Sequence, residues 1–180
     1  MQRLRVLLAL VLVLFIQLIL VSCSHSPSAS TVSTFRMGEK VQVGKLIFTV
    51  LETTWHSQLG EGTTARLPGQ RFLLVRIAVI NSGSQDTQIP PFTLVGDSGD
   101  TYSELADSTG VPHGLGVVRS VKPAESAQGQ IAFDVAPHHY VLKIEDQPGS
   151  DKAALVDLPL AFQTDPGPMM TPNVGEGKSR

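Results

Sequence analysis

The chain has 180 residues, a formal net charge of −2 at pH 7 and a single cysteine. This length suits one domain with additional segments at its ends. No cluster of lysine and arginine offsets the mildly acidic balance, so the sequence predicts no nucleic-acid partner. Because a disulfide needs two cysteines, the lone thiol is free, pairs between chains or is modified.

The first 23 residues have the features of an export signal. Two arginines precede an apolar run at residues 6–20, and the segment ends in Leu20-Val-Ser-Cys23. A run of this length matches the centre of a secretory signal, whereas a membrane-spanning helix usually needs about 20 residues. The segment resembles a bacterial lipoprotein signal peptide, and Leu20–Cys23 resembles the lipobox that the lipoprotein signal peptidase cleaves.

This resemblance implies that residues 1–22 are removed by cleavage between Ser22 and Cys23, and that the Cys23 sulfur then carries lipid. Lipidation explains both the number and the position of the cysteine. We therefore expect an extracytoplasmic protein anchored to a bacterial cell membrane or outer membrane, with no cofactor beyond the covalent lipid. An uncleaved signal anchor with an incidental cysteine is the alternative. Cleavage would remove Arg3 and Arg5 but no acid, which changes the formal charge from −2 to −4.

Polar segments flank the central part of the chain. Residues 23–36 are rich in serine and threonine, and residues 163–180 contain three prolines and three glycines. Neither segment offers enough apolar side chains to form a core. We expect a tether at 23–36, a domain at 37–162 and a disordered tail at 163–180.

The central residues follow the pattern of β-strands. Lys45–Trp55 is rich in β-branched and aromatic residues, with Leu46, Phe48 and Val50 at period two. Arg71–Asn81 is apolar on both faces, as is typical of a central strand. Six further strands are predicted at Phe92–Val95, Thr101–Ser103, Leu115–Val121, Gln128–Val135, Tyr140–Glu145 and Ala154–Leu160. Eight short strands without a helical repeat predict an all-β fold, an antiparallel sandwich or barrel.

Four segments of this region match a known arrangement. They are the strand and turn at Phe72–Gly83, the hairpin at Leu94–Tyr102, the bend at Val121–Gly129 and the strand at Ile131–Val135. Together they resemble the DUF4352 family of bacterial extracytoplasmic proteins, over residues 37–160. The resemblance implies an Ig-like antiparallel β-sandwich of about seven or eight strands. It transfers architecture and location only, because no catalytic residue defines the family.

One short string invites an enzymatic interpretation. Gly96-Asp-Ser-Gly99 matches the sequence around the nucleophile of trypsin-like proteases, and His56 and Asp86 precede Ser98 in the protease order. However, Asp86 and Ser98 are close in sequence, whereas those enzymes place the serine far downstream of the aspartate. Nothing specifies a general base within about 3 Å of the serine. We interpret the string as a hairpin turn and expect no enzymatic activity.

Two metal-site hypotheses remain open. Asp97 and Asp100, with Glu104 nearby, could supply oxygen ligands to calcium, which needs six to eight of them. His56, His113 and His139 could converge from separate loops on a transition metal. Solvated turn acids and isolated histidines are the competing interpretations.

Candidate binding residues lie at one set of loops. Ser57–Gly69 is the longest predicted connection, and long loops carry binding functions more often than short ones. Trp55 and His56 precede this loop, and His113 lies in the second candidate loop, Asp107–Gly114. In the competing interpretation, Trp55 caps one end of the core.

The leading functional hypothesis is a non-catalytic, membrane-anchored module that contacts another protein of the cell envelope. The sequence lacks a combination of nucleophile, base and orienting group, and the step from fold to role is an analogy. The alternative is an envelope lipoprotein that binds a small ligand or a metal.

Overall fold

The computed structural model describes residues 32–116 and 119–160. The expected signal peptide, Cys23 and the expected tail at 163–180 lie outside these ranges. Within the described ranges, no helix is long and apolar enough to cross a membrane.

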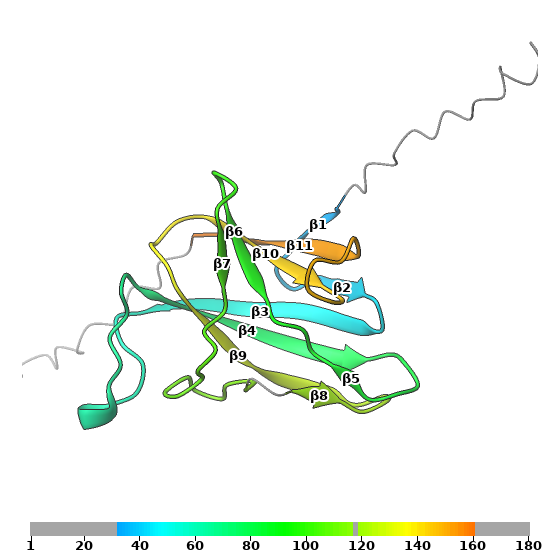
Figure 1. Ribbon diagram of the computed structural model, residues 1–180, viewed down its shortest axis with the longest axis horizontal. Helices are drawn as coiled ribbons and strands as arrows, with labels where there is room; N and C mark the ends of the chain where they lie inside the picture. The colour runs from blue at the N-terminus through cyan, green and yellow to red at the C-terminus, as the bar shows by residue number, and fades with distance from the viewer. Residues whose placement is uncertain (1–31, 117–118, 161–180) are drawn as a thin grey trace, which may run out of the picture. The chain divides into compact units, whose positions relative to one another are not determined.

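One sheet contains five strands in the order β1-β11-β10-β6-β7 (Figure 1). Their bounds are β1 Thr34–Arg36, β6 Thr93–Gly96, β7 Thr101–Ser103, β10 Tyr140–Glu145 and β11 Ala153–Leu158. Neighbouring strands are antiparallel except β1 and β11, which run parallel with Thr34 opposite Leu155 and Arg36 opposite Asp157.

The second sheet contains four antiparallel strands in the order β2-β3-β4-β9. Their bounds are β2 Lys40–Val43, β3 Leu46–His56, β4 Phe72–Asn81 and β9 Ser126–Asp134. Two short strands, β5 Thr87–Gln88 and β8 Ser120–Val121, pair separately, and a 3-10 turn, η1, spans Gly62–Thr64. The sandwich predicted from the sequence is confirmed.

The core lies between the two sheets. Alternate residues of β3 point inward, and Phe48 packs edge-on against Phe92 with ring centroids 5.8 Å apart. Each fully buried side chain of this size stabilises the fold by about 1.5–3 kcal/mol. On the other face of the second sheet, Phe72 and Leu74 join Leu59 in a smaller buried cluster. This second cluster explains why β4 is apolar on both faces.

Several predicted boundaries are wrong. Thr34–Arg36 falls within the expected tether, yet it forms β1, because Phe35 packs on the core and the three residues pair with β11. The strands β2 and β5 were also missed, since runs of four and two residues are too short to show a period. The predicted strand at 115–121 is a strand only at β8 in the described residues, and Gly116 adopts a φ of +77°. The described residues therefore form eleven strands rather than seven or eight, one pair of them parallel.

Candidate functional site

The two loops singled out for binding pack against each other. Leu59 pairs with Arg66 across the first loop, and Arg66 Nη1 lies 3.5 Å from the Asp107 carboxylate of the second. A Cβ added at Gly110 would lie 2.9 Å from the Gly60 nitrogen, so the two backbones are in close contact. Together the loops cover the smaller apolar cluster. Their contacts with each other and with that cluster stabilise the fold.

The three binding candidates of these loops have local partners. Trp55 is partly buried against the main core, as in the core-cap interpretation. His56 Nε2 lies 3.0 Å from Thr54 Oγ1 on the same strand. His113 has a φ of 48°, and its carbonyl accepts a hydrogen bond from the Gln130 amide at 3.0 Å. His113 therefore helps attach its loop to the edge of β9.

The string at residues 96–99 forms the turn between β6 and β7. The Gly96 amide donates to the Asp100 carbonyl at 2.8 Å, and Gly99 has a φ of +88°, which favours glycine. Ser98 Oγ donates to the Asp100 carboxylate at 2.5 Å. The serine hydroxyl is thus engaged by a neighbouring acid, and the string has the hairpin-turn geometry expected for it.

Two of the metal candidates, Asp97 and His139, do lie together. His139 Nδ1 is 2.8 Å from Asp97 Oδ1, and its Nε2 is 2.6 Å from Asp157 Oδ1. Hydrogen bonds to these two carboxylates raise the pKa of His139 above its ordinary value, with Asp97 the larger cause. The two acids therefore favour an imidazolium that donates from both nitrogens, which leaves no lone pair for a metal. Residues 32–116 and 119–160 contain no group of three potential ligands close enough to hold a metal.

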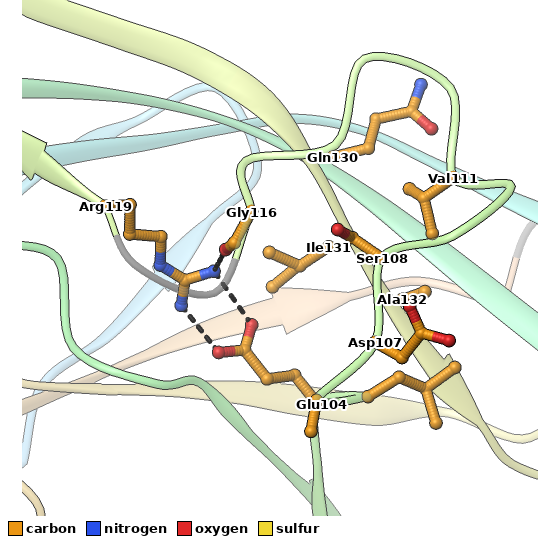
Figure 2. Close-up of a pocket in the computed structure, with 11 residues that line it drawn as sticks. Glu104, Asp107, Ser108, Val111, Gly116, Arg119, Gln130, Ile131 and Ala132 are labelled. Atoms are coloured by element: carbon orange, nitrogen blue, oxygen red, sulfur yellow. Dashed lines mark hydrogen bonds and ion pairs between the residues drawn. The ribbon is translucent and has the colours of Figure 1, made fainter.

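The ion pair of Arg119 and Glu104 is the most buried of the described salt bridges, and sequence reasoning did not identify it (Figure 2). Arg119 Nη2 lies 2.6 Å from Glu104 Oε1, and Nη1 lies 3.2 Å from Oε2. The remaining guanidinium N–H groups donate to three backbone carbonyls, those of Ile89, Pro90 and Gly116. All five donors of Arg119 are therefore engaged within the protein.

The environment of this pair is apolar on one side. The Arg119 guanidinium lies over the Phe92 ring, 5.0 Å from its centroid. Burial raises the pKa of Glu104 above its usual value, and the hydrogen bond and charge of Arg119 act in the opposite direction. A cavity of about 30 Å³ adjoins the pair on the side drawn in Figure 2. A cavity of this size has room for only a few water molecules.

A groove of about 810 Å³ opens on the other side of the pair, at one end of the sandwich. It lies between the β2–β3 turn, the β5 segment and the β10–β11 turn, which share one end of the two sheets in Figure 1. We call it the end groove. Its apolar lining includes Val43, Leu46, Ile89, Pro90, Pro91 and Pro148, and its charged lining is Lys45, Asp86, Glu104, Arg119, Asp146 and Lys152. The volume falls within the range of about 300–1,000 Å³ that is typical of ligand sites.

The charges of the end groove balance, with three cations and three anions. Glu104 and Arg119 neutralise each other, and Lys152 Nζ lies 4.0 Å from Asp146 Oδ2. The other carboxylate oxygen of Asp146, Oδ1, is buried and has no hydrogen-bond partner among the described residues. Because this oxygen is buried, it is not exposed to an occupant of the groove. The groove thus combines an apolar lining with no net charge, so it favours an occupant with little net charge of its own.

Little in the sequence could have identified the end groove. The residues that line it come from five segments, at 43–46, 86–91, 104–106, 119 and 146–152. The adjacent prolines Pro90 and Pro91 were the one local signal, because they interrupt the chain beside a predicted strand.

Three solved bacterial structures have similar folds. The yjhA protein of Bacillus subtilis is 16% identical, with a TM-score of 0.54, and the match covers 69% of this chain and 99% of that chain. The ycdA protein of B. subtilis strain 168, provisionally assigned as a lipoprotein, is 16% identical with a TM-score of 0.52; the match covers 67% of this chain and 38% of that one. A functionally unknown protein of Listeria monocytogenes is 11% identical, with a TM-score of 0.51 and coverages of 68% and 82%. At these identities the likeness shows the shared fold alone.

No curated protein matches the chain significantly. The model of the domain of unknown function DUF4352 matches residues 35–154. This match begins within β1, in agreement with the position at which the described sandwich begins, and it spans two thirds of the sequence. The chain therefore belongs to the DUF4352 family.

Proposed function

We propose that this protein is a non-catalytic binding module, attached to a bacterial membrane through lipid on Cys23, that holds a segment of another envelope protein in the end groove. The single observation that carries the proposal is the groove itself. It has the volume of a ligand site, an apolar lining and balanced charge. The provisional assignment of ycdA as a lipoprotein is in keeping with the anchor.

The side chains that could perform chemistry support a non-catalytic role. Ser98 donates to the carboxylate of Asp100 within its own turn, and His139 is held between two acids. Arg119 has all its donors engaged. Nucleophilic catalysis by a serine would also need a third group that orients the base.

A peptide segment fits the end groove better than a charged ligand does. Apolar side chains of an extended chain can cover Ile89 and Pro91. A phosphate or another anion would find three carboxylates among the lining residues. Balanced charge therefore favours a segment with little net charge of its own.

Crosslinking in intact cells tests the proposal. We expect the wild-type chain to recover one specific protein, and we expect Lys45→Glu combined with Asp86→Lys to lose it, because both changes alter the rim of the groove. The control combines Lys40→Glu with Glu61→Lys, which makes the same charge changes at exposed residues outside the groove. Recovery of the same proteins by the wild type, the groove variant and Cys23→Ala would contradict the proposal.

A small-ligand lipoprotein is the second candidate, and the volume of the end groove is the observation that favours it. Native mass spectrometry of the full chain separates the two functions. A stoichiometric small molecule that is present in the wild type and lost in the groove variant would favour the second candidate.

A further inference from the structure

The chain enters the sandwich beside the end groove. The carbonyl of Ser33 accepts a hydrogen bond from the Leu155 amide at 3.1 Å, and β1 begins at the next residue. Leu155 lies three residues after Lys152, which lines the groove on the β10–β11 turn. A Cβ at Gly44 would lie 3.1 Å from Asp146 Cβ, so the β2–β3 turn contacts that same turn. The start of β1 and the walls of the groove therefore lie at one end of the molecule (Figure 1).

The reach of the connecting chain is limited by its covalent length. Eleven residue steps separate Cys23 from Thr34, and a fully extended chain covers at most about 3.6 Å per step, or about 40 Å in total. The strand β3 contains 11 residues and runs from the groove end to the opposite end, a length of about 36 Å. A lipid on Cys23 can bring the opposite end to the membrane only if the connection is stretched almost fully along the domain. The groove end can approach the membrane without any such stretching.

We infer that the end groove faces the membrane and binds an extended, nearly neutral segment next to the membrane anchor of a second membrane protein. This inference rests on the proposed function, because it requires the lipid on Cys23. It adds the class of partner: a protein held in the same membrane rather than a secreted one.

The charges of the groove are compatible with this position. Its three cations and three anions give no net attraction to anionic headgroups, and Arg119 is already paired. The apolar prolines and Ile89 suit a polypeptide side chain more than a hydrated headgroup. Two proteins confined to one membrane also meet at a high effective concentration, so a groove of modest affinity suffices.

Site-specific photocrosslinking of the full chain in intact cells tests the inference. A photoreactive residue replaces Lys45 in the groove, and the matched control replaces Leu67, which is 75% exposed on the loop at the opposite end. The crosslinked peptides are located by mass spectrometry. In a further variant of this chain, a helical spacer of about 25 residues is inserted between Ala29 and Ser30. The spacer adds about 40 Å to the connection. The melting temperature of this variant is compared with that of the wild type to show that the sandwich is intact.

We expect the probe at position 45 to crosslink to a segment directly beside the membrane anchor of one protein. We expect the spacer to reduce this yield at least about tenfold and to leave the products of the probe at position 67 unchanged. A crosslink that maps far from a membrane anchor, that persists with the spacer, that joins only lipid, or that fails to form would overturn the inference.

The anchor is measured separately, by metabolic labelling with a clickable palmitate in the wild type and in Cys23→Ala. An unlabelled wild type would contradict the proposed function itself. If the wild type is labelled but the yield of the crosslink is the same with and without the spacer, only the inference about the partner would be contradicted.

Discussion

At the residue scale, the ion pair of Arg119 and Glu104 connects two loops that are not linked by strand pairing. Arg119 precedes β8 and Glu104 follows β7, and the guanidinium also holds the backbone carbonyls of Ile89 and Pro90. One side chain thus fixes the wall between the small cavity and the end groove. Removing one partner of such a buried pair leaves the other charge without compensation.

We predict that Arg119→Met lowers the free energy of unfolding by about 3–5 kcal/mol, because the Glu104 carboxylate stays buried without a partner. Urea denaturation measures this loss. The double variant Arg119→Met with Glu104→Met should recover part of it, since no unpaired charge remains, although three carbonyls still lack their donor. A loss below about 1 kcal/mol for the single variant would show that water replaces the pair.

The contacts of His139 predict a dependence of stability on pH. Its pKa is raised in the folded state by Asp97 and Asp157, so the stabilisation is complete below the unfolded pKa of about 6.5 and is lost as pH rises through the folded value. Because the imidazole is 40% exposed, the effect is that of a surface ion pair, below about 1 kcal/mol for each contact. Urea midpoints measured between pH 5.5 and 9 should show this loss for the wild type and not for His139→Gln.

The neighbouring residue provides the control. His138 is exposed, and His138→Gln should keep the pH dependence of the wild type. An unchanged pH profile in His139→Gln would assign the dependence to other groups.

Sequence reasoning singled out Asp97 and His139 for two separate metal-site hypotheses and did not predict that they lie together. Their common environment depends on Asp157, which lies on a strand far along the chain. Spacing could not reveal that both nitrogens of the imidazole would be engaged by acids. The cores of β3 and β4 could be predicted from the sequence, because burial follows the apolar side chains, on alternate residues at the start of β3 and on both faces of β4.

At the scale of elements, the edge of β9 is covered by an irregular segment instead of a strand. The Leu115 amide donates to the Gln130 carbonyl at 2.9 Å, and the Gln130 amide donates to the His113 carbonyl at 3.0 Å. Gly129 makes this approach possible, because a Cβ there would lie 2.8 Å from the His113 oxygen and 2.9 Å from Leu115 Cγ. An otherwise open strand edge is thereby protected from pairing with other chains.

We predict that Gly129→Ala destabilises the fold by about 1–3 kcal/mol, because the added methyl group collides with backbone atoms that cannot move independently. Hydrogen exchange of the Leu115 and Gln130 amides should become faster. Gly96→Ala in β6 is the matched control, since its Cβ would find nothing closer than 3.7 Å. Equal stability and equal exchange for both variants would contradict the prediction.

The strand β1 illustrates why short elements escape sequence reasoning. Three residues show no period, and their strand character comes from the ladder with β11 and from Phe35 against the core. The preceding serines and threonines made the same residues resemble the end of a tether. Tertiary contacts therefore determine the start of the domain, and local composition does not.

We predict that a chain beginning at residue 37 is less stable than one beginning at residue 32. Loss of β1 removes the Phe35 contact and exposes the backbone edge of β11, which should also promote aggregation. Thermal unfolding and light scattering measure the two effects. Identical melting temperatures and equal solubility would restore the boundary expected from the sequence.

At the scale of the whole molecule, the sandwich could be predicted because the apolar residues within a strand indicate which of its side chains are buried. In β10, for example, the alternate residues Tyr140, Leu142 and Ile144 point inward. The end groove could not be predicted, because its walls are turns brought together only by the pairing of distant strands. The glycine at position 44 and the acid at position 146 meet across two sheets. Neither residue has a sequence neighbour that indicates the other.

The position of β1 has a mechanical consequence. Tension applied to the chain ahead of Thr34 is transmitted first to a ladder of only three residue pairs at a sheet edge. The few backbone hydrogen bonds between β1 and β11 should therefore break first under force, while the nine paired positions of β4 and β9 remain intact. Detachment of β1 would then lengthen the connecting chain by the residues of β1. The tension would fall before it disrupted the core of the sandwich.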